Sequence, residues 1–200
     1  MPIEFRLLES SVEDGLGIPY RSRQGANGIM EYFDLKRSPS LIPKIRELRN
    51  HRELQEFVSD VNRKESLFKT LRCEMLHSCP SGMPTITHKV HWHFTFCFEI
   101  VDQNYKNSFD AFNSALYRYS QSLAESNHLL FELKLIPTSY RDHDITLWSE
   151  DIEIFGYGRT KPESKKQFKR GLRMLQHFMG RETKRYAGEL NKGRPTISSY

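Results

Sequence analysis

The strongest constraint on the fold is the regular alternation of apolar and polar residues from Lys89 to Ile100. Successive side chains of a β-strand point to opposite faces of a sheet, so this alternation predicts a half-buried strand. The members of its apolar face are Val90, Trp92, Phe94, Phe96, Phe98 and Ile100. Burying six such side chains contributes on the order of 10 kcal/mol as an upper value, so this face must pack on other apolar residues.

The segments around this strand predict an α+β domain. Apolar residues at helical spacing or in short runs, separated by turn-forming residues, indicate the other elements. These are helices at 38–64 (with Ser40 as N-cap) and 107–125, strands at 67–77, 87–101 and 129–136, and a turn at 79–84. Residues 145–157 fit either a strand or a short helix. The order predicts a mostly antiparallel sheet with helices packed on one face.

The ends of the chain differ from this core of residues 38–160. Residues 1–37 form an N-terminal extension of uncertain structure, in which 4–8 and 28–35 could be strands. Residues 161–200 comprise a basic helix over 162–190 and a loose tail. Three glycines in the helical segment predict a break in it. They are Gly171, Gly180 and Gly188.

Charge is distributed unevenly along the chain. The net charge is +5, but the last 40 residues carry eleven Lys and Arg against three Glu, which leaves about −3 for the rest. A basic segment on a nearly neutral body favours a polyanionic partner such as nucleic acid, and the alternative is a solvated helix face. No segment resembles a membrane span or a secretion signal, so we expect a cytoplasmic protein without a membrane partner. The odd number of cysteines, three, favours buried thiols over disulfides.

Two histidines on the polar face of the alternating strand suggest a metal site. His91 and His93 lie side by side on one face, and a hairpin with strand 67–77 would bring Glu74 to the same side. Two imidazoles and one carboxylate suit a catalytic Mg, Mn or Zn ion with open positions for phosphate. The alternatives are two ordinary histidines on an exposed sheet, and a Glu74 that pairs with a neighbouring cation.

A tyrosine close to the basic segment is the candidate nucleophile. Tyr157 lies between two glycines, and its oxygen could attack phosphorus to give a covalent intermediate. The alternative is an aromatic residue in a turn. The cations that follow are expected to hold the nucleic-acid backbone. They are Arg159, Lys161, Lys165, Lys166, Lys169, Arg170 and Arg173.

Glu74, a turn and His91-Trp92-His93 on the next strand resemble the HUH endonuclease superfamily. The closer resemblance is to rolling-circle replication initiators of filamentous phages, prophage elements and plasmids, over roughly half of the chain. It implies a ferredoxin-like or RRM-like core, a divalent metal on His91, His93 and Glu74, and nicking of DNA through a 5′-phosphotyrosine. In that family the tyrosine usually precedes a lysine by three residues on a helix, whereas Tyr157 and Lys161 are four apart.

These observations leave three functions open. The first is a replication-initiator-like protein that binds and nicks single-stranded or hairpin DNA. The second is a non-enzymatic module of the same fold that binds DNA or RNA, with sheet aromatics stacking on bases. The third is a phage-type inhibitor whose basic helix covers an acidic protein partner.

Overall fold

A computed structural model describes residues 3–8, 16–18, 24–25, 28–29, 34–45, 48–80, 86–100, 104–123, 128–140 and 145–191. At 16–18, 24–25, 28–29, 74–80, 140, 145, 190 and 191 it describes the backbone alone. The predicted loose tail beyond residue 191, and most of the predicted turn at 79–84, lie outside the described residues.

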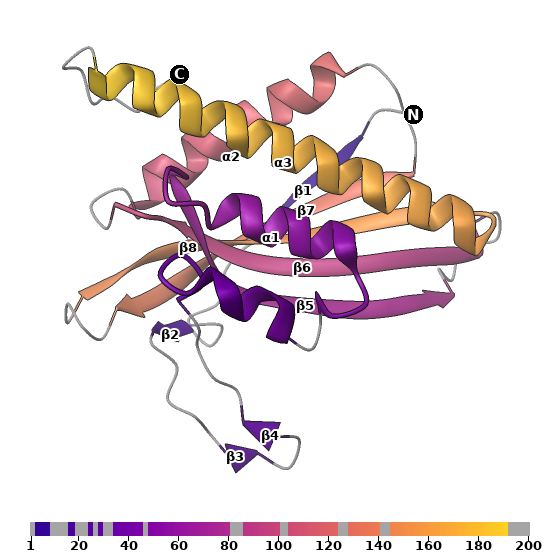
Figure 1. Cartoon of the computed structure of the whole chain (residues 1–200). Coiled ribbons are helices and arrows are strands. Elements are labelled where there is room, and N and C mark those ends of the chain that lie inside the picture. Colours follow the sequence, from indigo (N-terminus) through magenta and orange to yellow (C-terminus); the bar gives the residue numbers. More distant parts are fainter. Residues whose placement is uncertain are drawn as a thin grey trace.

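The central element is a mixed six-stranded sheet in the order β1-β7-β8-β6-β5, with β2 also pairing with β7 (Figure 1). Its strands are β1 (Glu4–Leu8), β2 (Leu16–Ile18), β5 (Phe68–Pro80), β6 (His88–Phe98), β7 (Leu129–Tyr140) and β8 (Ile145–Gly158). The pairs β5–β6, β6–β8 and β7–β8 are antiparallel, whereas β1 and β2 run parallel to β7. The short strands β3 (Gln24–Gly25) and β4 (Gly28–Ile29) pair separately.

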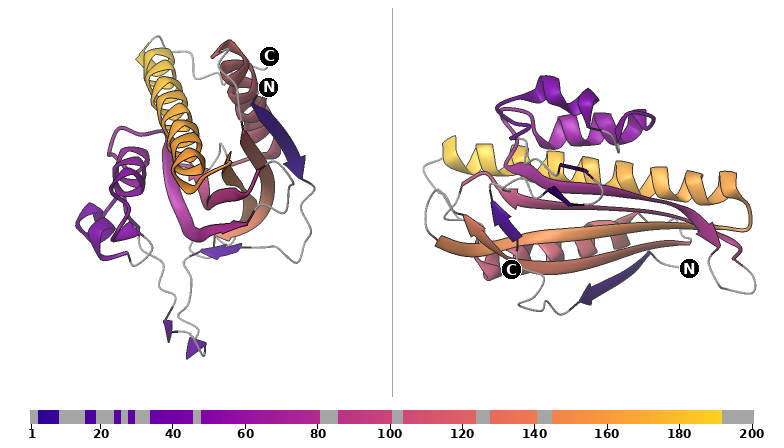
Figure 2. Two further views of the ribbon diagram at one scale, coloured as in Figure 1. Left: turned by 90° about the vertical axis from the view of Figure 1, so that its right-hand side faces the viewer. Right: turned by 90° about the horizontal axis from the view of Figure 1, so that it is seen from below.

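Three α-helices pack against the sheet. They are α1 (Arg52–Val61), α2 (Lys106–Ser122) and α3 (Lys161–Asn191). Figure 2 shows the sheet curving, with α2 and α3 over its concave side and α1 beside α3. The predicted α+β class, with helices on the sheet and a C-terminal helix, is confirmed.

The order of strands and helices along the chain is a circularly shifted form of the ferredoxin-like order. From β5 onward the chain runs β5-β6-α2-β7-β8-α3. If β8 and α3 preceded β5, the order would be β-α-β-β-α-β, that of a ferredoxin-like unit. The last strand and helix of this chain therefore take the positions of the first strand and helix of that unit, and β1 and β2 extend the sheet beyond β7.

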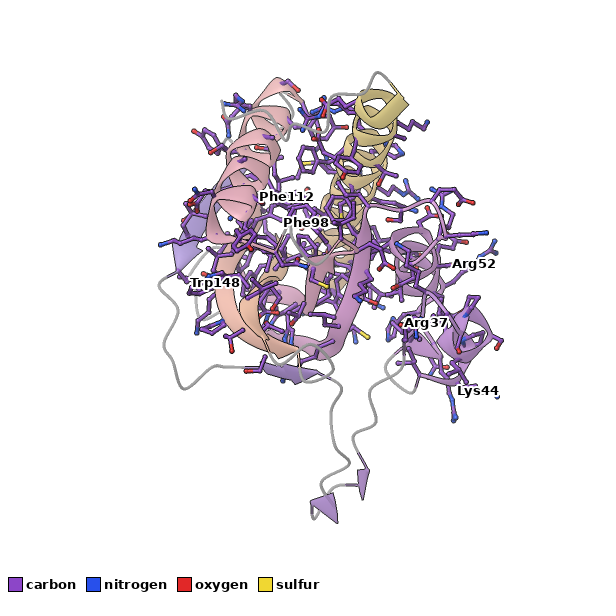
Figure 3. All side chains as sticks on the ribbon, turned by 90° about the vertical axis from the view of Figure 1, so that its left-hand side faces the viewer. Arg37, Lys44, Arg52, Phe98, Phe112 and Trp148 are labelled. Atoms are coloured by element: carbon purple, nitrogen blue, oxygen red, sulfur yellow. The ribbon has the colours of Figure 1, made fainter. Side chains whose placement is uncertain are left out.

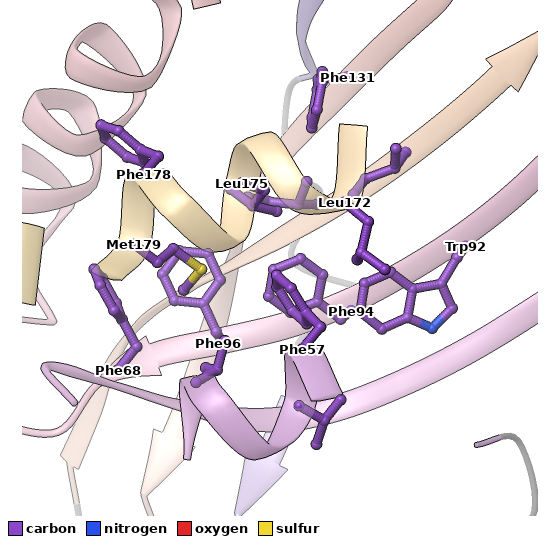
Figure 4. Packing of buried hydrophobic residues seen from close by; sticks show 14 of the residues in the cluster. Phe57, Phe68, Trp92, Phe94, Phe96, Phe131, Leu172, Leu175, Phe178 and Met179 are labelled. Carbon is purple, nitrogen blue, oxygen red and sulfur yellow. The ribbon is translucent and has the colours of Figure 1, made fainter. Parts of the chain in front are cut away.

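The aromatic face of β6 forms the centre of the core. Trp92, Phe94 and Phe96 are fully buried, and Leu172 and Leu175 of α3 lie over them (Figure 4). Phe57 of α1 packs edge-on against Trp92 and Phe94, and Phe98 packs on Phe109 and Phe112 of α2. The expected apolar layer over this face is thus supplied by all three helices.

The predicted helix at 38–64 is wrong as a single element. The chain instead forms a 3-10 helix, η2 (Pro39–Lys44), and then α1. Pro39 and Pro43 lie in η2, and a proline inside a helix removes a hydrogen-bond donor and clashes with the preceding turn. Ser40 lies inside η2 and is not its N-cap, a position held by Ser38 without a side-chain hydrogen bond.

The predicted break in the C-terminal helix is also absent, because α3 is continuous from Lys161 to Asn191. Gly171 is needed where it is: a Cβ there would lie 2.6 Å from Leu129 of β7 and 3.0 Å from Ile154 of β8. The helix begins with a capping box in which Glu163 Oε2 accepts hydrogen bonds from the backbone N–H groups of Arg159 and Thr160, and Thr160 Oγ1 accepts one from Glu163 N. Tertiary packing and this cap override the low helix propensity of glycine.

No helix in the described part of the chain is long and apolar enough to cross a membrane.

Candidate functional site

The two histidines lie on the face of the sheet opposite the helices. Strand β6 is flanked by β5 and β8, and alternation sends His91 and His93 away from the aromatic core. The polar sheet face is the set of residues that share this side of β6 and β8. These are Lys89, His91, His93 and Thr95 of β6, and Asp151, Glu153, Phe155 and Tyr157 of β8.

This face is more buried than the sequence predicts. His91 is 9% exposed, His93 8% and Thr95 1%, so β6 is buried on both sides rather than half-buried. The exposed setting assumed by the alternative of two ordinary histidines is therefore wrong. Neighbouring side chains on β8 account for part of the burial, as the contacts of His91 and Thr95 show.

His91 is held by two residues of β8. Its ring stacks on Phe155, with ring centroids 4.2 Å apart and planes 13° from parallel. Its Nε2 lies 2.5 Å from Oε2 of Glu153, a close polar contact without the alignment of a good hydrogen bond. This contact lowers the pKa of Glu153 although burial of the carboxyl acts in the opposite direction. His91 therefore favours the ionised form of Glu153.

A second carboxyl of β8 lies one position along the same face. Asp151 Oδ1 accepts a hydrogen bond of 2.8 Å from Thr95 Oγ1. Burial raises the pKa of Asp151, and His93 and the Thr95 hydrogen bond oppose that effect. The two histidines therefore lie among two carboxyls whose pKa values are displaced in opposite directions, an arrangement found often in functional sites.

Glu74 occupies the expected position in the backbone register. It pairs directly with His93 across β5 and β6, and Glu153 pairs with His93 from the other side. The Glu74 side chain lies outside the described residues. Thr70, four residues before Glu74 on the same strand, lies with the core, where its hydroxyl accepts a hydrogen bond of 2.8 Å from Asn62. A bulge between Thr70 and Arg72 changes the alternation at this point.

Tyr157 shares the face of the histidines. It pairs with Lys89, and its ring stacks loosely on Phe155 with centroids 6.2 Å apart. It lies in a strand and not in a turn or a helix. Gly156 and Gly158, which flank it, serve the opposite face: a Cβ on either would lie 2.4–2.5 Å from backbone atoms in the first turns of α3. The close approach that these glycines permit is between β8 and α3.

The predicted cations are divided between two places. Arg159 and Lys161 lie where β8 passes into α3, and the Arg159 carbonyl accepts a hydrogen bond from Thr87 Oγ1. The others are on α3, on the opposite side of the sheet from the histidines. They are Lys165, Lys166, Lys169, Arg170 and Arg173. The structure thus places His91, His93 and Tyr157 on one face of the sheet, with Tyr157 opposite Lys89, two residues from His91 and four from His93 along β6, and separates all three from most of the basic residues.

The donor types on the polar sheet face suit a divalent cation, but the described side chains do not converge on one point. Two imidazoles with carboxylate oxygens fit Mn or Zn chemistry. Among the residues with described side chains, no group of three or more His, Cys, Asp or Glu is placed to hold a metal. Cys97 is buried and Cys73 half-buried, and neither forms a disulfide.

Sequence reasoning missed Asp151, Glu153 and Phe155. The signal was present, because Asp151, Glu153 and Phe155 alternate with Ile152 and Ile154. Because the segment fitted either a strand or a helix, the sequence did not predict that these three residues share a face. Only a strand places them on one face.

Comparisons with protein-family models, with curated proteins and with solved structures give no match to this chain.

Proposed function

We propose that this protein binds single-stranded or hairpin DNA and cleaves it at the polar sheet face, with Tyr157 as the nucleophile. The observation that carries the proposal is the shared face: two buried histidines, the ionised Glu153 and Tyr157 project from adjacent strands. A rigid sheet is a suitable support for groups that must be held in fixed positions around a phosphate.

The reaction would be a transesterification. The phenol of Tyr157 loses its proton and its oxygen bonds to phosphorus, while the bond from phosphorus to the 3′ oxygen breaks and that oxygen takes up a proton. The products are a 5′-phosphotyrosine and a free 3′-hydroxyl, with no change in oxidation state. A divalent ion, Mg or Mn, held by His91 and His93 with Glu74, would supply charge neutralisation at the phosphate.

A second candidate is binding without cleavage. One observation favours it: most of the cations lie on α3, across the sheet from the histidines, so binding there does not need the polar sheet face. The stacking of bases on Trp92, Phe94, Phe96 or Phe98 is not part of this candidate, because these rings are buried under the helices. A protein partner for α3 is the remaining alternative.

The test is cleavage of end-labelled single-stranded and hairpin DNA in Mg²⁺ or Mn²⁺, resolved on a denaturing gel. We expect wild type to give a DNA product covalently bound to protein, and Tyr157→Phe to give none. The matched control is Tyr117→Phe, an exposed tyrosine of α2, which should cleave like wild type.

The histidines are tested by the double variant His91→Gln/His93→Gln, with circular dichroism to show that it is folded. Loss of cleavage with DNA binding retained supports the proposal. If wild type binds DNA but cuts none with either metal, the catalytic proposal is wrong and the second candidate stands.

A further inference from the structure

The outward side of α3 carries a row of basic side chains, which is dense from Lys166 to Arg173 and resumes at Lys184. We define the outer stripe as the residues that recur at spacings of three, four and seven along this side. They are Lys166, Arg170, Arg173, His177 and Lys184. Such spacing places residues on one face of a helix, and 18 residues at 1.5 Å each give the stripe a length of about 27 Å.

No acidic side chain interrupts the outer stripe. Glu163 belongs to the capping box, and Glu182 is buried with its carboxylate 2.7 Å from Arg185. Within the described part of the chain, Lys166, Arg173 and Lys184 form no ion pair or side-chain hydrogen bond. Their charge is therefore available to a ligand.

Other cations of α3 are engaged within the protein. Lys169 pairs with Glu53 of α1, and the Arg181 guanidinium lies 4.6 Å from the ring centroid of Tyr119 on α2. These contacts fix the two flanks of α3 to its neighbouring helices. The outer stripe is what remains between the flanks, facing away from the sheet.

The form of the stripe distinguishes between nucleic-acid partners. Proteins that bind single strands combine cations with exposed aromatic rings on which bases stack. The exposed residues of α3 that the structure describes include no Phe, Tyr or Trp. Gly156, Gly158 and Gly171 also let the N-terminal part of α3 pack closely on the sheet, so the packing holds the array of cations there in place. Such an array suits the fixed phosphate spacing of a duplex better than a flexible strand.

We propose that the outer stripe of α3 binds the phosphate backbone of a DNA duplex, such as the stem of a hairpin, on the side of the sheet opposite His91 and His93. The binding is independent of sequence and driven by release of counterions. The inference takes one element from the proposed function, namely that the partner is DNA. A single-stranded segment next to the stem would reach the polar sheet face by passing the end of the sheet at Arg159 and Lys161.

The test measures binding of a fluorescent hairpin stem and of a single strand of equal length by anisotropy, between 50 and 300 mM salt. We expect wild type to bind the stem more tightly. The variant Lys166→Ala/Arg173→Ala/Lys184→Ala should bind it on the order of tenfold more weakly, with the slope of log K against log salt reduced by about 2 to 3.

The control removes three exposed cations elsewhere, in Arg37→Ala/Lys44→Ala/Arg52→Ala. These side chains extend from the part of the molecule formed by η2 and α1 (Figure 3). The control should keep the wild-type slope to within about one unit, since it changes net charge equally without touching the stripe.

Three results would overturn the inference: equal losses in both triple variants, tighter binding of the single strand, or no binding of either DNA at 50 mM salt. The last would direct attention to an acidic protein partner.

The outcomes of the binding test are separable from those of the cleavage test. If the stripe variant weakens stem binding while wild type cuts nothing, the inference stands and the catalytic proposal falls. If cleavage is seen and the stripe variant binds like the control, the catalytic proposal stands and the inference about the outer stripe falls.

Discussion

Two glutamates of β8, three residues apart, have opposite electrostatic environments. Glu150 points into the helix-covered core and is fully buried, with one hydrogen bond of 3.1 Å from Asn113 Nδ2 to its Oε2. Its Oε1 has no hydrogen-bond partner, and burial raises its pKa well above the usual value. Glu153, on the polar sheet face, has a pKa lowered by His91. The two carboxyls therefore make opposite contributions to the pH dependence of stability.

Replacing Glu150 with Gln should stabilise the protein at neutral pH. The raised pKa means that the unfolded chain ionises this carboxyl first, so wild type loses stability as the pH rises from about 4.5 toward the folded-state pKa. Glu150→Gln lacks this loss. We expect its free energy of unfolding to exceed that of wild type by about 1–3 kcal/mol at pH 7.5 and by little at pH 4. Urea unfolding at both values measures it, with the exposed Glu65→Gln as control. A variant less stable than wild type at both pH values would contradict this prediction.

Replacing Glu153 with Gln should act in the other direction. A lowered pKa contributes stability above the unfolded value of about 4.5, and that contribution is lost as the pH falls through the folded-state pKa. Because the Glu153 side chain is 29% exposed, the loss at pH 7.5 should stay below about 1 kcal/mol. The same urea titrations give the comparison, and a difference that persists at pH 3 would contradict this reading.

At the scale of elements, β6 was predictable and β8 was not. The alternation of β6 and its helix-covered aromatic face follow directly from its sequence. For residues 145–157 the apolar spacing fits both the helical period and the strand period. Long-range pairing decides between them, because β8 is a central strand paired on both sides. The same holds for the site. The shared face of His91 and His93 followed from alternation, whereas the register of Glu74 and the position of Glu153 depended on how β5 and β8 pair with β6.

Glycines in and next to α3 should respond to substitution according to what they touch. A Cβ at Gly156 would lie 2.4 Å from Phe168 N and Ser164 O, so Gly156→Ala must push α3 away from β8, at a cost of about 3 kcal/mol or more. At Gly180 nothing lies within 4 Å, and Gly180→Ala should stabilise the helix by about 0.5–1 kcal/mol. Thermal unfolding of both variants measures the contrast. Equal effects would mean that α3 does not pack on β8 as described.

At the scale of the whole molecule, the N-terminal segment is part of the main sheet. Strand β1 runs parallel to β7 at the edge, and Phe5 stacks on Phe131 with ring centroids 5.1 Å apart while meeting Tyr117 edge-on. The strand at residues 4–8 was predicted from the local pattern, but its partner was not, because pairing between residues 126 positions apart depends on the fold and not on the segment.

Phe5→Ala tests whether β1 contributes to global stability. We expect a loss of about 2–4 kcal/mol, somewhat less than for a fully buried phenylalanine, because two aromatic contacts are removed. Leu7→Ala, two residues along the same strand and 71% exposed, should change stability by no more than about 0.5 kcal/mol. Chemical unfolding followed by tryptophan fluorescence reports both. Indistinguishable variants would mean that β1 is dispensable.

Strand β8 serves two surfaces at once. Its even-numbered positions from 150 to 158 lie beneath the helices, and its odd-numbered positions from 151 to 157 line the polar sheet face. A strand with one solvated side tolerates substitution at every second residue. Both sides of β8 make contacts, so neither side should tolerate substitution freely. In a saturation mutagenesis screen, residues 150–158 should therefore form one continuous block of intolerance. Substitutions in its even-numbered half should lower abundance, as should those at the buried Phe155, and on the proposed function the other odd-numbered positions should lose activity at normal abundance.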